Sequence, residues 1–187
     1  MARKNLGMEA IRNRVRKMVE MRDEYIKHLE DVHVRLMQGN TKTGKSCWTV
    51  SLIPIADCIN CSGCMKTCYD ICNVCYIPDV QKTRAMNSAI HKADKERFWK
   101  EIEMGCMFNG VQELRINVGG DLDDDDFEYI NEMGKKLHRT DILFFTKNYQ
   151  GINKWMDIHG DFNSNVKPIM SAWIGMEMDN HHNLPCS

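Results

Sequence analysis

The sequence predicts an α/β protein in which about four strand–helix units form a partial (β/α) barrel or an open parallel sheet, preceded by a long helix. Two observations support this class. Short runs rich in β-branched and aromatic residues alternate with segments of helical periodicity, and each run ends in glycine or polar residues. A chain of 187 residues suits one such domain. We expect an N-terminal amphipathic helix over residues 1–38 and a cysteine-rich α/β domain over residues 39–187.

The N-terminal helix is predicted from apolar residues that recur at spacings of three and four between Met8 and Leu36. Gly39 and Asn40 follow this run and are typical of a left-handed helix cap. The period is close to the heptad of a coiled coil. The helix therefore either lies across its own domain or pairs with a second copy of the chain.

The remaining elements follow in alternation. Strands are expected at residues 47–55, 113–118, 141–146 and 166–174, and helices at 83–107, 123–138 and 151–159. Acidic residues at the start of the second of these helices and basic ones at its end suit the helix dipole. We interpret Asp123 to Asp126 as a solvated helix start, with a divalent-cation site as the alternative.

Residues 39–46 spell G-x-x-x-x-G-K-S, the pattern of the phosphate-binding loop of nucleotide hydrolases. Such a loop must leave a strand and open a helix, so that its N–H groups converge on the phosphates. Here the glycine loop follows a helical pattern, and the residues after Ser46 are typical of a strand. We therefore expect no nucleotide hydrolase.

Six of the nine cysteines fall in one short segment: Cys58, Cys61, Cys64, Cys68, Cys72 and Cys75. The first four have the C-x2-C-x2-C-x3-C spacing of bacterial ferredoxins, although Tyr69 stands where those have proline. The last three have the spacing C-x3-C-x2-C. Thiolate ligands without histidine suit an iron–sulfur cluster, with zinc as the alternative. All six are candidate metal ligands.

Candidate ligand-binding residues follow the other predicted strands. Gly119, Gly120 and Asp121 come after the second strand, Thr146 and Lys147 at the end of the third, and Ser171 near the end of the fourth. The carboxyl ends of parallel strands meet at one edge of a sheet, where α/β folds place their chemistry. We expect these side chains to surround one site, reached from the first strand by the cysteine segment.

Composition and charge argue against several partners. The chain has 25 basic and 26 acidic residues, a balance that does not indicate a nucleic-acid partner or an anionic membrane. No apolar run reaches the roughly 18 residues of a membrane span, and the N-terminus lacks the apolar stretch of a signal peptide. We expect a cytoplasmic protein, and a homodimer formed through the N-terminal helix or a sheet edge.

This order of features resembles the first half of a radical S-adenosylmethionine barrel. That superfamily holds a [4Fe-4S] cluster with a C-x3-C-x2-C triplet, and a GGE segment contacts the amino group of the cofactor's methionine part. The resemblance implies this contact for Gly119, Gly120 and Asp121, with Asp in place of the usual Glu. The same resemblance implies that the remaining rim residues, Thr146, Lys147 and Ser171, line the cofactor pocket.

More closely, the chain resembles the phage gene product 88-like family of phages and mobile elements. The matching segments are residues 39–45, 51–58, 61–69, 84–87, 115–121, 144–149, 171–173 and 182–185. The recurring cysteines of the family correspond to Cys58, Cys61, Cys64 and Cys68, so Cys61, Cys64 and Cys68 rank highest as ligands. The resemblance implies a protein in the cytoplasm of a bacterial host.

Two hypotheses follow. The first is a radical-enzyme-like iron–sulfur protein that binds S-adenosylmethionine at an open iron of a [4Fe-4S] cluster. The second is a non-enzymatic interaction module, in which an iron–sulfur cluster or zinc stabilises a small core. In the second, the long helix recruits a partner or a second copy.

Overall fold

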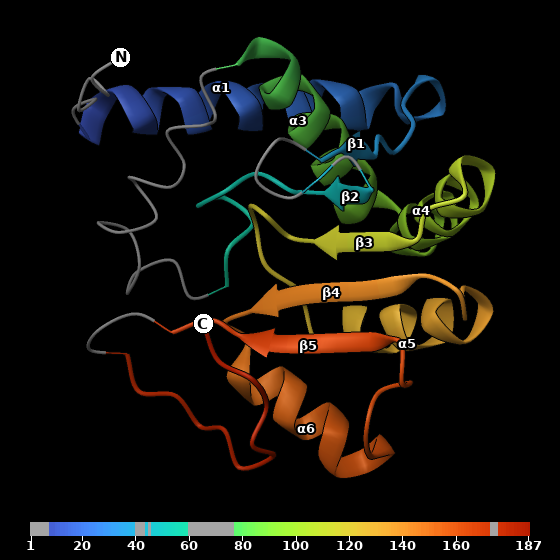
Figure 1. Cartoon of the computed structure of the whole chain (residues 1–187). Helices are drawn as coiled ribbons and strands as arrows, with labels where there is room; N and C mark the ends of the chain where they lie inside the picture. Colours follow the sequence, from blue (N-terminus) through green and yellow to red (C-terminus); the bar gives the residue numbers. More distant parts are fainter. Residues whose placement is uncertain (1–7, 40–43, 45, 60–76, 173–175) are drawn as a thin grey trace.

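The computed structural model describes residues 8–39, 44, 46–59, 77–172 and 176–187, and its centre is a sheet in the order β1-β2-β3-β4-β5. Strands β2 (Cys47–Val50), β3 (Glu113–Ile116), β4 (Asp141–Thr146) and β5 (Val166–Met170) are parallel, whereas β1 (Met37–Gln38) is antiparallel to β2. The arrows of the four parallel strands point to the same side of the molecule (Figure 1). The α/β class and the parallel sheet are thereby confirmed.

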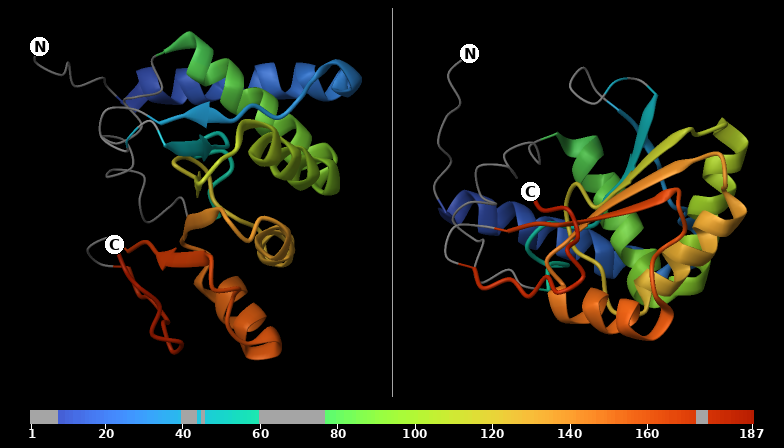
Figure 2. Two further views of the ribbon diagram at one scale, coloured as in Figure 1. Left: turned by 45° about the vertical axis from the view of Figure 1, so that its right-hand side comes forward. Right: turned by 60° about the horizontal axis from the view of Figure 1, so that its bottom comes forward.

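The described helices are α1 (Met8–Lys27), the short 3-10 helix η1 (Leu29–Asp31), α3 (Pro78–Ala93), α4 (Lys95–Asn109), α5 (Asp126–Lys136) and α6 (Tyr149–His159). Because the parallel strands follow one another in chain order, right-handed connections place their helices on the same face of the sheet. Figure 2 shows α4, α5 and α6 on one side of it. The core lies between these helices and the strands, with Ile116, Phe127, Ile142 and Phe144 fully buried.

The first helix is shorter than predicted. It ends at Lys27 rather than near Leu36, and Gly39 follows strand β1 instead of capping a helix. The chain near Arg35 is held instead by the buried side chain of Asn87, which accepts a hydrogen bond from the Arg35 N–H and donates one to the Arg35 carbonyl. A residue of α3 thus replaces the bonds that a further helical turn would have made.

Gly39 donates its N–H to the carbonyl of Cys47, and β1 pairs antiparallel with β2. The segment that carries the phosphate-loop motif therefore joins two antiparallel strands, and a strand follows Ser46. A phosphate-binding loop needs a helix N-terminus at that point. The expectation that the motif is not a nucleotide site agrees with this arrangement.

Helix α1 packs against the domain rather than standing apart from it. Met18 is fully buried and clusters with Ile53, which belongs to the loop after β2. Arg22, on the same helix, forms an ion pair with Asp57 of that loop, with 3.5 Å between Nη1 and Oδ1. Figure 1 shows α3 crossing α1, and the two helices are in contact. The helix therefore helps to hold the loop that leads toward the cysteines.

One predicted helix is two. Residues 83–107 were expected to be continuous, but α3 ends at Ala93 and α4 begins at Lys95. Asp94 lies at the break in an extended conformation, and its carboxylate accepts a hydrogen bond from the N–H of Arg97. Aspartate is a preferred N-cap, so the break has a local cause.

We expect Asp94→Ala to lower the free energy of unfolding by about 1 kcal/mol, because the first turn of α4 loses its cap. Asp94→Asn should keep the cap and lower the free energy of unfolding by only a few tenths of a kcal/mol. Urea unfolding followed by circular dichroism measures both. Equal losses in the two variants would contradict a capping role.

Candidate functional site

The loop after β2 and the turn after β3 are joined by backbone hydrogen bonds. Asn117 donates to the Val50 carbonyl at 3.0 Å, Leu52 donates to Gly119 at 2.9 Å, and Asp121 donates to Asp57 at 2.8 Å. The pairing of the two strands thus continues beyond their regular ends. As a result, the loop that ends in Cys58 lies directly against the glycine–acid turn.

Packing requires a glycine at position 120 of this turn, and the space at Gly119 is also narrow. Gly120 has φ +87°, and a Cβ atom there would lie 2.6 Å from the Cβ of Leu52. At Gly119 it would lie 3.3 Å from the guanidinium of Arg84. The absence of a side chain at Gly120 lets the two loops come together.

Asp121 links the ends of β3 and β4. Only 4% of the residue is exposed, and its Oδ1 accepts from the Thr146 hydroxyl at 2.7 Å and from the Leu122 N–H at 2.9 Å. Its Oδ2 accepts from the Lys147 N–H at 3.1 Å. Burial raises the pKa of this carboxyl, while those hydrogen bonds oppose the rise. Asp121 therefore organises the turn.

The strand ends surround one pocket of about 250 Å³. It is lined by Cys58, Arg115, Asn117, Val118, Gly119, Gly120, Asp121, Phe145, Lys147, Ser171, Ala172 and Ser187. Residues that follow all four parallel strands thus meet, as the sequence predicted for this edge. Of the six candidate cofactor residues, Thr146 alone is not part of the wall, because it lies buried behind Asp121.

Three further lining residues determine the pocket's chemistry: Arg115, Asn117 and Phe145. The Arg115 guanidinium lies 4.5 Å from the centre of the Phe145 ring, a cation–π arrangement. Asn117 is 7% exposed, and its Nδ2 has no hydrogen-bond acceptor among the described residues. With Lys147, these groups offer positive charge and an amide donor, which suit a ligand with a carboxylate or other oxygen acceptors.

Cys58 is the one clustered cysteine that the structure describes, and its sulfur accepts a hydrogen bond from the N–H of Ile55 at 3.2 Å. Hydrogen bonds to sulfur of this kind are also a feature of the cysteines that hold iron–sulfur clusters. Cys58 also borders a second cavity of about 390 Å³ with Arg22, His91 and Lys95. The other five candidates, Cys61, Cys64, Cys68, Cys72 and Cys75, lie outside the described residues.

The aspartate run is not a solvated helix start throughout. Asp126 is completely buried and accepts hydrogen bonds from His91 and from the Trp99 indole, both at 2.9 Å, and from the N–H of Asp123 at 2.8 Å. The last bond closes the turn that leads into α5. The Nζ atom of Lys95 lies 3.0 Å from Oδ2 of Asp123 and 3.9 Å from Oδ1 of Asp126. This ammonium group offsets part of the negative charge of the two carboxylates.

No protein-family model, curated protein or solved structure matches this chain. Among the described helices, none combines the length and the apolar character needed to cross a bilayer. The resemblance to radical S-adenosylmethionine enzymes and to the phage family therefore stays a prediction.

Proposed function

We propose that this protein binds an iron–sulfur cluster through cysteines of its 58–75 segment, and that the adjacent pocket holds part of S-adenosylmethionine. The observation that carries the proposal is the position of Cys58. It lies on the wall of the same pocket as Gly119, Lys147 and Ser171, although these residues are far apart in the sequence. A cysteine segment that only stabilised the core would have no need to meet the polar strand ends.

The pocket suits the amino-acid portion of the cofactor. Its volume of about 250 Å³ is below the roughly 300–1,000 Å³ typical of complete small-molecule sites. Lys147 and Arg115 would pair with the carboxylate, and the Asn117 amide would donate to an oxygen. Asp121 would act indirectly by holding the Lys147 backbone in place. When bound, the cluster would supply an open iron and a one-electron reductant.

A non-enzymatic metal module is the second candidate. The four parallel strands form an open sheet among the described residues, and a bound metal can add folding free energy to such a domain. In this case zinc or a fully ligated cluster would replace missing core. The iron content and the response to S-adenosylmethionine separate the two candidates.

Anaerobic purification should yield a protein that contains iron and acid-labile sulfide. We expect the electron paramagnetic resonance spectrum of the reduced protein to change when S-adenosylmethionine is added. Cys68→Ala should lose most of the iron, whereas Cys47→Ala, in strand β2, should retain it. Stoichiometric zinc without sulfide would contradict the proposal, and a cluster whose spectrum ignores the cofactor would favour the second candidate.

We expect Lys147→Ala to weaken S-adenosylmethionine binding about tenfold or more, since a charge-assisted hydrogen bond contributes about 1.5–3 kcal/mol. The iron content should not change, because Lys147 belongs to the pocket and not to the cysteine segment. Lys154→Ala, on the exposed face of α6, is the matched control. Isothermal titration calorimetry measures the binding. Equal affinity in both variants would remove Lys147 from the site.

A further inference from the structure

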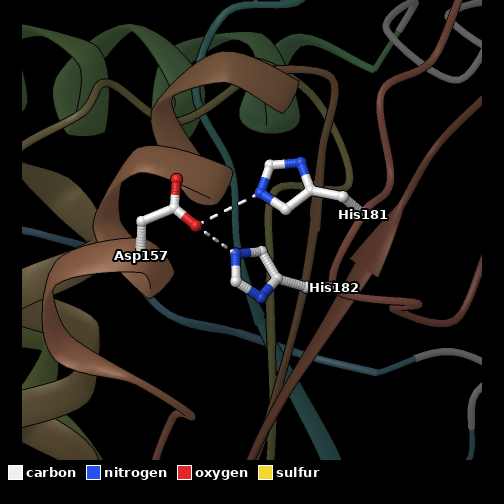
Figure 3. Close-up of side chains that lie close together, drawn as sticks. All are labelled: Asp157, His181 and His182. Atoms are coloured by element: carbon white, nitrogen blue, oxygen red, sulfur yellow. Dashed lines mark hydrogen bonds and ion pairs between the residues drawn. The ribbon is translucent and has the colours of Figure 1, made fainter.

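Two histidines of the C-terminal segment converge on one carboxylate of α6. The Nε2 atom of His181 lies 3.2 Å from Oδ1 of Asp157, and the Nε2 atom of His182 lies 3.0 Å from the same oxygen. Figure 3 shows both rings directed at Asp157. The three candidate ligand atoms lie within 4.8 Å of one another.

A built turn brings the two rings to the same side. Asn183 has φ +55° and donates its N–H to the Asn180 carbonyl, so the two histidines occupy the centre of the turn. The Asn180 side chain secures it by accepting from the Leu184 N–H at 2.8 Å and donating to the Leu184 carbonyl at 2.9 Å. Adjacent side chains usually diverge, and this local geometry makes them converge.

His181 lies between two carboxylates. Its Nδ1 atom is 3.0 Å from Oδ1 of Asp179, while its Nε2 atom faces Asp157. A neutral imidazole carries one N–H and cannot donate to both groups. If Nδ1–H donates to Asp179, then Nε2 faces Asp157 with a lone pair, and either a second proton or a metal cation can lie between the two atoms. Histidines that ligate metals characteristically donate their other N–H to a carboxylate in this way.

We propose that Asp157, His181 and His182 bind a zinc ion, with Asp179 orienting His181. In a tetrahedral site with metal–ligand bonds of about 2.0–2.1 Å, ligand atoms are about 3.3 Å apart. The two observed nitrogen–oxygen separations, 3.0 and 3.2 Å, are within a few tenths of an ångström of this value. Two imidazoles and one carboxylate suit zinc better than calcium or magnesium, which prefer oxygen ligands. Asp157 and Asp179 together balance the charge of the ion.

The site would fasten the C-terminal segment to α6 and so support the pocket wall. In this segment the backbone of Cys186 forms an isolated β-bridge with Met170 of β5. The N–H of Ala172 also donates a hydrogen bond to the carbonyl of Ser187. Ser187 lines the pocket at the strand ends. Zinc at Asp157 would thus stabilise the position of one wall of the candidate cofactor site. The zinc site itself does not depend on the identity of that cofactor.

Zinc titration of the full chain tests the proposal, with metal content measured after removal of unbound ion. We expect His182→Ala to bind one zinc equivalent fewer than the unmodified protein, and Asp179→Ala to bind that equivalent about 10–100-fold more weakly. His138→Ala, a histidine of the loop after α5, should bind the full amount. All of these proteins contain the same cysteine segment. Any metal bound by that segment contributes equally to each protein and does not affect the difference between them.

Hydrogen exchange provides an independent measurement. Zinc should slow amide exchange in residues 176–187 of the unmodified protein and have no such effect in His182→Ala. Because His182 lies at the surface of a turn, the variant should retain its fold and its iron content. Equal zinc stoichiometry in the two proteins, or equal exchange with and without zinc, would overturn the proposal.

Discussion

Asp126→Ala is expected to lower the free energy of unfolding by about 3–5 kcal/mol, because each buried donor that loses its acceptor costs about 1–3 kcal/mol. The variant leaves His91 and the Trp99 indole without their common acceptor inside the core. It also removes the hydrogen bond from the Asp123 N–H at the start of α5. Because His91 belongs to α3 and Trp99 to α4, this one carboxylate joins three helices. Chemical denaturation followed by tryptophan fluorescence measures the loss.

The neighbouring Asp125 provides the matched control. Its side chain is 81% exposed and makes no capping hydrogen bond, so Asp125→Ala should change the stability by no more than about 0.5 kcal/mol. The same substitution is thus expected to be strongly destabilising at one position and nearly neutral at its neighbour in a run of identical residues. Similar losses in the two variants would show that Asp126 is not the buried acceptor described here.

The pH dependence of stability reports on the same group. Burial alone would raise the pKa of Asp126, but the hydrogen bond from His91 and the charge of Lys95 hold it below its ordinary value of 3.8. A carboxyl whose pKa is lower in the folded state contributes stability above its unfolded pKa and loses it as the pH falls. The unmodified protein should therefore lose this contribution progressively below about pH 4–5. Asp126→Ala should show a smaller decrease over that range.

Gly120→Ala is expected to lower the free energy of unfolding by about 2–4 kcal/mol, because two unfavourable effects add. A residue with a side chain is disfavoured at φ +87°, and its Cβ would meet Leu52 Cβ at 2.6 Å. The clash would separate the loop after β2 from the turn after β3, which form the wall shared by Cys58 and Asp121. We therefore expect weaker S-adenosylmethionine binding as well as a lower melting temperature.

Gly110→Ala separates the two effects. Gly110 also has a positive φ, of 59°, but a Cβ there would meet nothing within 4 Å. Gly110→Ala, at the C-cap of α4, should lower the free energy of unfolding by about 1 kcal/mol, because only the unfavourable backbone conformation contributes. Thermal unfolding of both variants gives the comparison. If Gly120→Ala costs no more than Gly110→Ala, then the two loops are not packed as tightly as described.

Local patterns predicted most of the elements. Strand β4 has the expected bounds, and α5, α6, β3 and β5 lie within a few residues of the predicted ranges. Apolar periodicity is a property of neighbouring residues, so the chain shows it directly. The common edge at Gly119, Lys147 and Ser171 was predictable for a related reason. Parallel strands necessarily bring their carboxyl ends together.

The sequence alone therefore determined the α/β class, the parallel sheet and the edge at which the candidate site lies. Only the tertiary structure decided where α1 ends, which aspartate is buried and why Gly120 is a glycine. It also decided that His181 meets Asp157. Asn87 and Arg35 are 52 positions apart, His91 and Asp126 are 35 apart, and His181 and Asp157 are 24 apart. No periodicity encodes such pairs, because their energies arise only after packing has brought distant side chains into contact.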